Sequence, residues 1–248
     1  MLLKACLNGA RLPAESAALP ATPAALARDA VAVRAAGAGA VHLHVKDADG
    51  VDTLGADELT SVLQAVREAA ALPVGVTTGA WTLPDPGQRV VAIQSWTALP
   101  DFASLNWHEE GTDEVAEALL GRGVGIEAGL WHADGVAAWL SSPYRDRCMR
   151  VLLELPDGLD EGDTQAEADR LLTQVREGVR ERPAVALRVL LHGEGSSCWP
   201  ALRQAARLGL DMRIGLEDTL EMPDGSVAPD NAALVAAARD LISTIEVL

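Results

Sequence analysis

Two histidines separated by one residue have the spacing best suited to chemistry in this chain. His42 and His44 lie in a short apolar segment, residues 41–45. Side chains two residues apart in a β-strand point to the same side, so both imidazoles face one region of space. Two hydrogen-bonded core or rim histidines are the structural alternative, since imidazole is both a common metal ligand and a common buried polar group. A third ligand nearby would favour a metal site.

Glu217 is the candidate for that third ligand. It follows residues 213–216, which we predict as the eighth strand of a closed sheet. Strands eight and two of such a barrel both flank strand one, and alternate strands contribute to the same layer of inward side chains. Two histidines and one carboxylate leave coordination positions open for water or substrate, as in catalytic metal sites. We therefore predict a divalent metal on His42, His44 and Glu217.

Arg213 and Asp218 flank this carboxylate in the sequence. Arg213 is separated from Glu217 by an even number of positions, so the two can share one face of a strand. An arginine beside carboxylates lowers their pKa and can bind a substrate carboxylate through two hydrogen bonds. A plain salt bridge at the rim is the alternative, and only convergence with the histidines favours a catalytic role.

Polar residues follow or end several other predicted strands. These are Thr77, Thr78, Gly79, Asn106 and Glu127. Residues 192–197 form a glycine-rich segment before a predicted helix, which is suited to holding an anion. Each of these also has an ordinary function in a turn or a cap. Their shared position at the carboxyl ends of strands favours contact with a substrate.

The elements that must position these residues alternate regularly along the chain. Segments rich in Val, Leu and Ile alternate with segments of helical periodicity, as expected for βα units around a parallel sheet. Predicted strands cover residues 3–8, 40–45, 74–78, 102–105, 124–128, 149–153, 187–191 and 213–216. Predicted helices cover residues 22–36, 57–71, 86–95, 112–121, 133–141, 164–181, 200–208 and 231–244. Eight units predict one α/β domain over residues 1–248, a (β/α)₈ TIM barrel, with a doubly wound open sheet as the alternative.

Composition narrows the class of partner. The 248 residues carry a formal net charge of −16, which disfavours nucleic acid and anionic membranes as partners. No apolar stretch approaches the length of a transmembrane helix. The three cysteines, Cys6, Cys148 and Cys198, are far apart and suggest neither a disulfide framework nor a zinc ribbon. We therefore expect a globular protein of the reducing cytoplasm that acts on a small molecule.

Several short motifs, in order, resemble the β-keto acid cleavage enzymes, the family that includes 3-keto-5-aminohexanoate cleavage enzyme. The resemblance covers nearly the whole chain. It rests on Asn-Gly-Ala at 8–10, Leu-Pro-Ala-Thr-Pro at 19–23, Ala-Gly-Ala at 36–38, His-Leu-His at 42–44, Thr-Gly at 78–79, Leu-Asn at 105–106, Arg-Ile-Gly-Leu-Glu-Asp at 213–218 and Asp-Asn-Ala at 230–232 followed by Leu-Val at 234–235.

The resemblance implies a zinc-dependent barrel that takes a β-keto acid and acetyl-CoA. Such an enzyme releases acetoacetate and the CoA thioester of the shortened acid. By the resemblance, His42, His44 and Glu217 bind Zn²⁺, while Arg213 and Asp218 form an acid–base pair. Thr78, Gly79 and Asn106 match positions near the keto acid. The relatives also imply a homo-oligomer.

Two departures from the family pattern bear on function. Arg11 stands where the best-known pattern has a catalytic-site glutamate, and Lys46 stands where it has an arginine. Glu15 is a candidate substitute for the lost acid, while Arg11 is a candidate contact for an anionic substrate or for the CoA phosphates. Two alternatives stay open: a metal-dependent, aldolase-like carbon–carbon lyase that does not use CoA, and a barrel that binds keto acids without catalysis.

Overall fold

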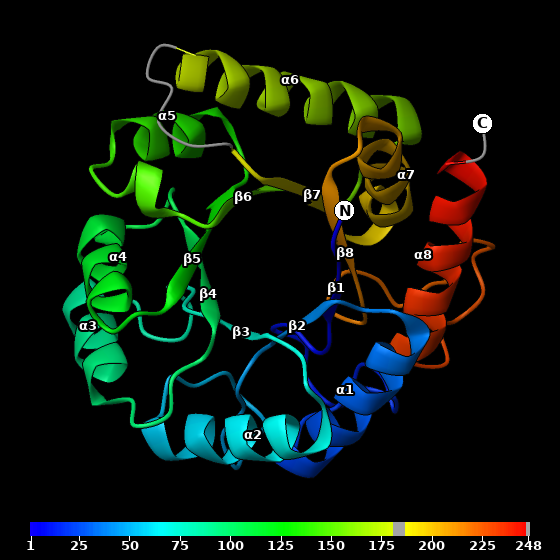
Figure 1. The fold of residues 1–248 in the computed structure, drawn as a ribbon. Coiled ribbons are helices and arrows are strands. Elements are labelled where there is room, and N and C mark those ends of the chain that lie inside the picture. Colours follow the sequence, from blue (N-terminus) through cyan, green and yellow to red (C-terminus); the bar gives the residue numbers. More distant parts are fainter. Residues whose placement is uncertain (181–186, 247–248) are drawn as a thin grey trace.

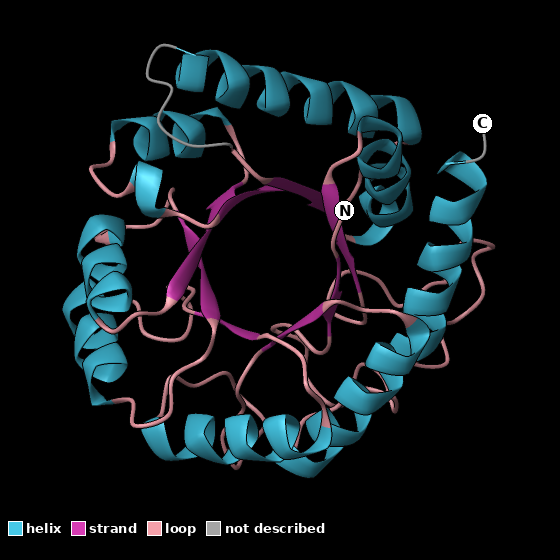
Figure 2. Ribbon diagram, in the orientation of Figure 1, coloured by secondary structure: helices cyan, strands magenta, loops and turns pink. Residues whose placement is uncertain are grey.

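A closed ring of parallel strands forms the centre of the molecule. The computed structural model describes residues 1–180 and 187–246. Within these residues, eight strands pair in sequence order from β1 to β8, and β8 pairs back onto β1. Eight α-helices surround the ring (Figures 1 and 2). The predicted (β/α)₈ barrel is confirmed, and an open doubly wound sheet is excluded.

The strands are β1 (Leu3–Cys6), β2 (Ala40–Leu43), β3 (Val74–Thr77), β4 (Phe102–Asn106), β5 (Gly125–Leu130), β6 (Arg150–Leu155), β7 (Val189–Gly193) and β8 (Asp211–Ile214). The helices are α1 (Pro23–Ala36), α2 (Ala56–Ala69), α3 (Pro86–Ser95), α4 (Thr112–Gly121), α5 (Ala133–Ser141), α6 (Glu161–Arg180), α7 (Cys198–Leu208) and α8 (Asn231–Glu246). Short 3₁₀ turns cover Arg145–Arg147 and Gly195–Ser197.

Side-chain caps fix where several helices begin. The Thr22 hydroxyl accepts a hydrogen bond from the Ala25 N–H at 3.2 Å, so Thr22 is the N-cap of α1 and the helix begins at Pro23. Helix α6 begins three residues earlier than predicted, because the Asp160 carboxylate accepts from the Asp163 N–H at 2.8 Å. The predicted end of this helix, Glu181, lies outside the described residues.

All eight strands end at positions that differ from the prediction, and three of these differences bear directly on the site. Strand β8 ends at Ile214, because Gly215 packs against β1: a Cβ there would lie 1.9 Å from the Cys6 carbonyl oxygen. Glu217 therefore lies in the loop after β8. Strands β6 and β7 run two residues further than predicted, and Glu154 pairs with His192 across their ladder. Glu154 lines a cavity, and the buried His192 pairs with it, its Nε2 lying 3.2 Å from Glu154 Oε2.

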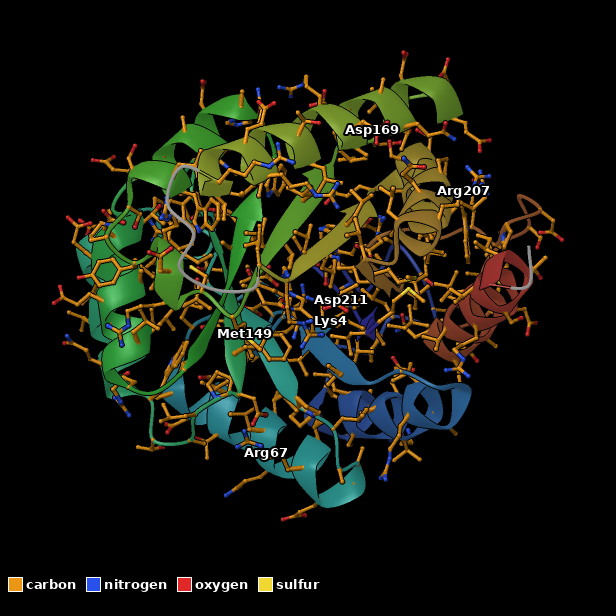
Figure 3. All side chains as sticks on the ribbon, turned by 45° about the horizontal axis from the view of Figure 1, so that its top comes forward. Lys4, Arg67, Met149, Asp169, Arg207 and Asp211 are labelled. Atoms are coloured by element: carbon orange, nitrogen blue, oxygen red, sulfur yellow. The ribbon has the colours of Figure 1, made fainter. Side chains whose placement is uncertain are left out.

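A layer of charged residues fills the amino-terminal end of the barrel. Lys4 Nζ lies 2.5 Å from Glu127 Oε2, and Arg150 Nε lies 3.1 Å from Glu127 Oε1. Asp211 extends this network to Arg150 at 3.4 Å, and Figure 3 labels Lys4 and Asp211 near the centre of the ring. The apolar core lies between the strands and the helices. In residues 1–180 and 187–246, we find no helix with the length and apolar character that a membrane span requires.

Candidate active site

The three predicted metal ligands converge at the carboxyl end of the barrel. His42 lies in β2, His44 one residue beyond it, and Glu217 three residues beyond β8. His42 Nε2 is 3.7 Å from Glu217 Oε2, and His44 Nε2 is 3.9 Å from Glu217 Oε1. One ligand atom from each residue can be chosen so that all three lie within 4.8 Å of one another. The strand pairings bring these groups together, since β1 lies between β2 and β8.

This donor set fits a divalent metal. Metal–ligand bonds of 2.0–2.2 Å in a tetrahedral site place ligand atoms roughly 3.4 Å apart, close to the spacing of the imidazoles and the carboxylate. Glu217 Oε2 is buried and has no hydrogen-bond partner among the described residues. A buried acceptor without a donor is costly, and a cation between the three groups would satisfy it. Burial also lowers the pKa of His42, which favours the neutral, metal-binding imidazole.

Asp52 orients the second histidine. Its Oδ2 lies 2.7 Å from His44 Nδ1 and accepts from Trp81 Nε1 at 2.9 Å, while Oδ1 accepts from Lys46 Nζ at 2.6 Å. When a carboxylate binds one nitrogen of a histidine ring, it fixes the ring so that the other nitrogen can face a metal. The sequence analysis did not identify Asp52. Gly50 was the available sequence signal, because it allows a tight turn after Lys46. That turn brings the chain back so that Asp52 pairs with Lys46.

Arg213 connects Glu217, one of the candidate metal ligands, to a second buried carboxylate. Its Nη2 lies 2.9 Å from Glu217 Oε1 and 2.6 Å from Asp218 Oδ1, and its Nε lies 3.0 Å from Asp218 Oδ1. Burial raises the pKa of Asp218, and the positive charge of Arg213 acts in the opposite direction. On the far side of Asp218, His192 Nδ1 lies 3.7 Å away, and its Nε2 lies 3.2 Å from Glu154.

A cavity of about 370 Å³ opens above these groups. The metal-site residues His42, His44 and Glu217 line it, and so does Arg213. Of the other predicted site residues, it brings together Arg11, Glu15, Thr77 and Asn106. Arg11 Nη1 donates to Glu15 at 3.1 Å, and Arg11 Nε donates to the Leu216 carbonyl at 2.7 Å. Both residues of this ion pair therefore lie beside the metal position.

Four predicted site residues do not line the cavity. Thr78 donates its hydroxyl hydrogen to the Ser104 carbonyl at 2.8 Å, and Gly79 lies under the Trp81 ring. Asp218 is fully buried behind Arg213. Glu127 is placed in the charged layer below, because it lies inside β5 and not at its end. The expectation of a Glu127 contact with substrate is corrected accordingly.

Two carboxylates of the cavity were not among the predicted site residues. Glu154 and Glu194 line the cavity from β6 and from the end of β7. Burial raises the pKa of both glutamates, that of Glu194 to about 7. The predicted ends of β6 and β7 stopped two residues short, which hid the position of Glu154 at the rim.

The glycine-rich segment after β7 is not arranged as an anion site. The Ser196 N–H donates to Asp157 Oδ1 at 2.8 Å, and the Gly195 N–H donates to the Asp218 carbonyl at 2.8 Å. The Ser197 N–H donates to the Glu194 carbonyl at 3.0 Å. These donors are used within the protein, so the expected site for an external anion there is wrong.

The family assignment follows from the sequence as a whole. Residues 1–247 match the sequence profile of the beta-keto acid cleavage enzymes. The chain belongs to the beta-keto acid cleavage enzyme family. This assignment agrees with the metal-binding geometry of the site, since His42, His44 and Glu217 form the one group in the described residues that could hold a metal ion.

Solved structures support the fold of this family member. It is similar to ObcA in a ternary complex with a C4-CoA adduct and oxalate, with 20% identity and a TM-score of 0.69 over 92% of this chain and 64% of that one. Apo ObcA gives 19% identity and a TM-score of 0.65, over 91% of this chain and 62% of that one. The spore coat polysaccharide biosynthesis protein SpsE of Bacillus subtilis gives 16% identity and a TM-score of 0.60, over 99% of this chain and 68% of that one. The chain thus spans less than two thirds of ObcA.

Proposed function

We propose that this family member is a zinc-dependent enzyme that converts a β-keto acid and acetyl-CoA into acetoacetate and the CoA thioester of the shortened acid. The observation that carries the proposal is the convergence of His42, His44 and Glu217 on one point of the cavity, with Arg213 in contact with Glu217. Two histidines and a carboxylate with an open position are typical of catalytic zinc. Membership of the family supplies the reaction class.

The overall reaction balances without an oxidant or a reductant. A carbon–carbon bond forms between the acetyl carbonyl carbon and the carbon next to the substrate carboxylate. The bond from that carbon to the substrate's own keto carbon breaks, and the released acyl group takes the sulfur that the acetyl group leaves. A proton must leave the carbon next to the carboxylate before it can act as a nucleophile, so the site requires a base.

Arg213 and Asp218 are the proposed acid–base pair. Arg213 lines the cavity and Asp218 lies directly behind it, so the guanidinium can meet a substrate carboxylate while Asp218 neutralises its charge. Asp218 does not line the cavity, so we assign proton transfer to the Arg213–Asp218 pair as a unit: Arg213 faces the substrate, and Asp218 Oδ2, which has no hydrogen-bond partner among the described residues, is the proposed final acceptor. The same pair returns the proton to that carbon when acetoacetate is released. When bound, a metal ion supplies Lewis-acid stabilisation of charge on the keto oxygen.

Arg11 and Glu15 together take the place of the glutamate that the best-known family pattern has at position 11. Arg11 is held by the Leu216 carbonyl, one residue before the metal ligand Glu217. We assign Arg11 to the anionic end of the substrate and Glu15 to the missing acid. Thr77 and Asn106, which line the same cavity, supply hydrogen-bonding groups for the rest of the keto acid. Thr78 and Gly79 then shape the loop that carries Trp81.

The test is turnover of the zinc-loaded protein with acetyl-CoA and a panel of β-keto acids. We expect acetoacetate to form in step with a new CoA thioester. Cleavage of the keto acid without consumption of CoA would establish the lyase alternative instead. Binding of a keto acid without turnover on any member of the panel would support the non-catalytic alternative. A cytoplasmic location, a homo-oligomer and a single domain over residues 1–248 stay predictions.

A further inference from the structure

The proposed acyl transfer needs room for a molecule much larger than the cavity. The cavity of about 370 Å³ suits a β-keto acid and an acetyl group. The remainder of acetyl-CoA, a long pantetheine arm and a nucleotide, has to leave through the mouth of the barrel. A surface that continues from the mouth is therefore required by the reaction.

A groove of about 570 Å³ lies beside the cavity, between the end of β5 and helix α6. Trp131 lines both hollows, and its Nε1 lies 3.3 Å from Asn106 Oδ1 inside the cavity. On its other side the groove is lined by Pro156 and Leu159 from the loop after β6, and by Ala166 on α6. Helix α6 crosses the upper edge of the molecule in Figure 1.

The charges of the groove select a neutral occupant. Arg170 and His132 are the basic side chains that line it. The guanidinium of Arg170 is already bound by Glu167, with Nε 2.7 Å from Oε2, and His132 Nδ1 accepts from the Gly135 N–H at 3.4 Å. Asp163 adds a further negative charge. Phosphate groups would meet repulsion here, whereas a pantetheine arm has no charge and combines apolar carbons with two amides. Ligand grooves of that kind are mostly apolar with a few polar groups.

We propose that this groove binds the pantetheine arm of the CoA thioester, with Trp131 at the point where the arm enters the cavity. The inference rests on the proposed function and assigns a binding surface to its second substrate. The thioester reaches the keto acid across the indole of Trp131.

Ala166→Trp tests the proposal because Ala166 is exposed on α6 and lines the groove. The new indole should fill the groove without disturbing the core. Thr173→Trp is the matched control, since Thr173 is exposed on the same helix and does not line the groove. We expect Ala166→Trp to raise the KM for acetyl-CoA at least about tenfold. The KM for the β-keto acid, and turnover with acetyl-N-acetylcysteamine, which lacks most of the arm, should match the parent.

Equilibrium binding of CoA to the same three proteins separates the inference from the proposed function. We expect CoA to bind the parent and the Thr173→Trp variant equally, and Ala166→Trp at least about tenfold more weakly. Equal binding by all three, with CoA-dependent turnover intact, would overturn the groove and leave the proposed function standing. A parent that neither binds nor consumes CoA would overturn both. Thermal unfolding of both variants checks that α6 is intact.

Discussion

The Nδ1 atom of His44 lies 2.7 Å from Oδ2 of Asp52, and this contact determines which imidazole nitrogen faces the metal position. Asp52 also accepts hydrogen bonds from Lys46 and Trp81. Burial acts to raise the pKa of Asp52, but these hydrogen bonds outweigh it and lower the pKa to about 2. The carboxylate is therefore charged at neutral pH and holds the ring of His44 in one orientation.

Asp52→Asn should weaken zinc binding about 10- to 100-fold, because it removes the charge that orients His44 and makes it a stronger ligand. Competition against a chelator of known affinity measures the change. Asp49→Asn is the control, since Asp49 is exposed in the same loop. Equal zinc affinity in the two variants would show that Asp52 does not position His44.

Gly9 is the second position that controls the metal site from outside it. Its φ is +58°, and a Cβ there would lie 2.5 Å from Cγ of Glu217. Gly9→Ala should displace the Glu217 carboxylate and lower zinc affinity. Gly225→Ala is the matched control, because Gly225 has a φ of +82° and no heavy atom within 4 Å of the added Cβ. Both variants should lose about 1–2 kcal/mol of folding free energy. Unchanged zinc affinity in Gly9→Ala would contradict the packing described.

Arg213→Met should cost about 3–5 kcal/mol of folding free energy, because it leaves the carboxylate of Asp218 buried without its cation. Urea denaturation measures the loss. The double variant, Arg213→Met with Asp218→Asn, should recover a large part of the lost folding free energy, since the uncompensated charge is then gone. Additive losses in the double variant would mean that the two side chains are not coupled. Both variants should lack activity.

Glu194 should make stability depend on pH around neutrality. Burial raises its pKa from 4.5 to about 7, so the folded state holds this proton more tightly than the unfolded chain. The resulting stabilisation is complete below the unfolded pKa and is lost as pH rises through about 7. In the parent, the free energy of unfolding should therefore fall by up to about 3 kcal/mol between about pH 5 and about pH 8 on account of this group. The Glu194→Gln variant should lack that fall. Urea titrations at both pH values measure this, with the exposed Glu177→Gln as control. An identical pH dependence in Glu194→Gln and the parent would refute it.

The barrel was predictable because eight apolar segments alternate with helical periodicity over the whole chain. The positions of His42 and His44 followed from the two-residue repeat of β2, and Glu217 from the closure of β8 onto β1. These are consequences of local pattern and of barrel topology. His44 and Glu217 lie one and three residues beyond their strands, so pattern and topology predict the end of the barrel at which they meet, and the loop geometry completes the site.

The residues that the sequence did not reveal depend on loop geometry and on strand ends. Asp52 reaches His44 only because the loop after β2 turns back on itself. Glu154 was hidden because hydrophobic pattern stops before the strand does at a polar rim. Glu127 was misplaced by the same error: its strand runs two residues beyond the predicted end, so a residue taken for the rim lies one layer deeper. Pattern alone does not give depth along the barrel axis.

The central claim is a metal centre on His42, His44 and Glu217, and equilibrium zinc titration tests it most directly. The parent should bind about one zinc ion per chain at a tight site, which is the expected stoichiometry of a three-ligand catalytic centre. His42→Ala should lose that site, while His108→Ala, which changes a histidine outside the group, should keep it. A parent that binds no zinc, or a His42→Ala variant that binds it as tightly as the parent does, would contradict the account.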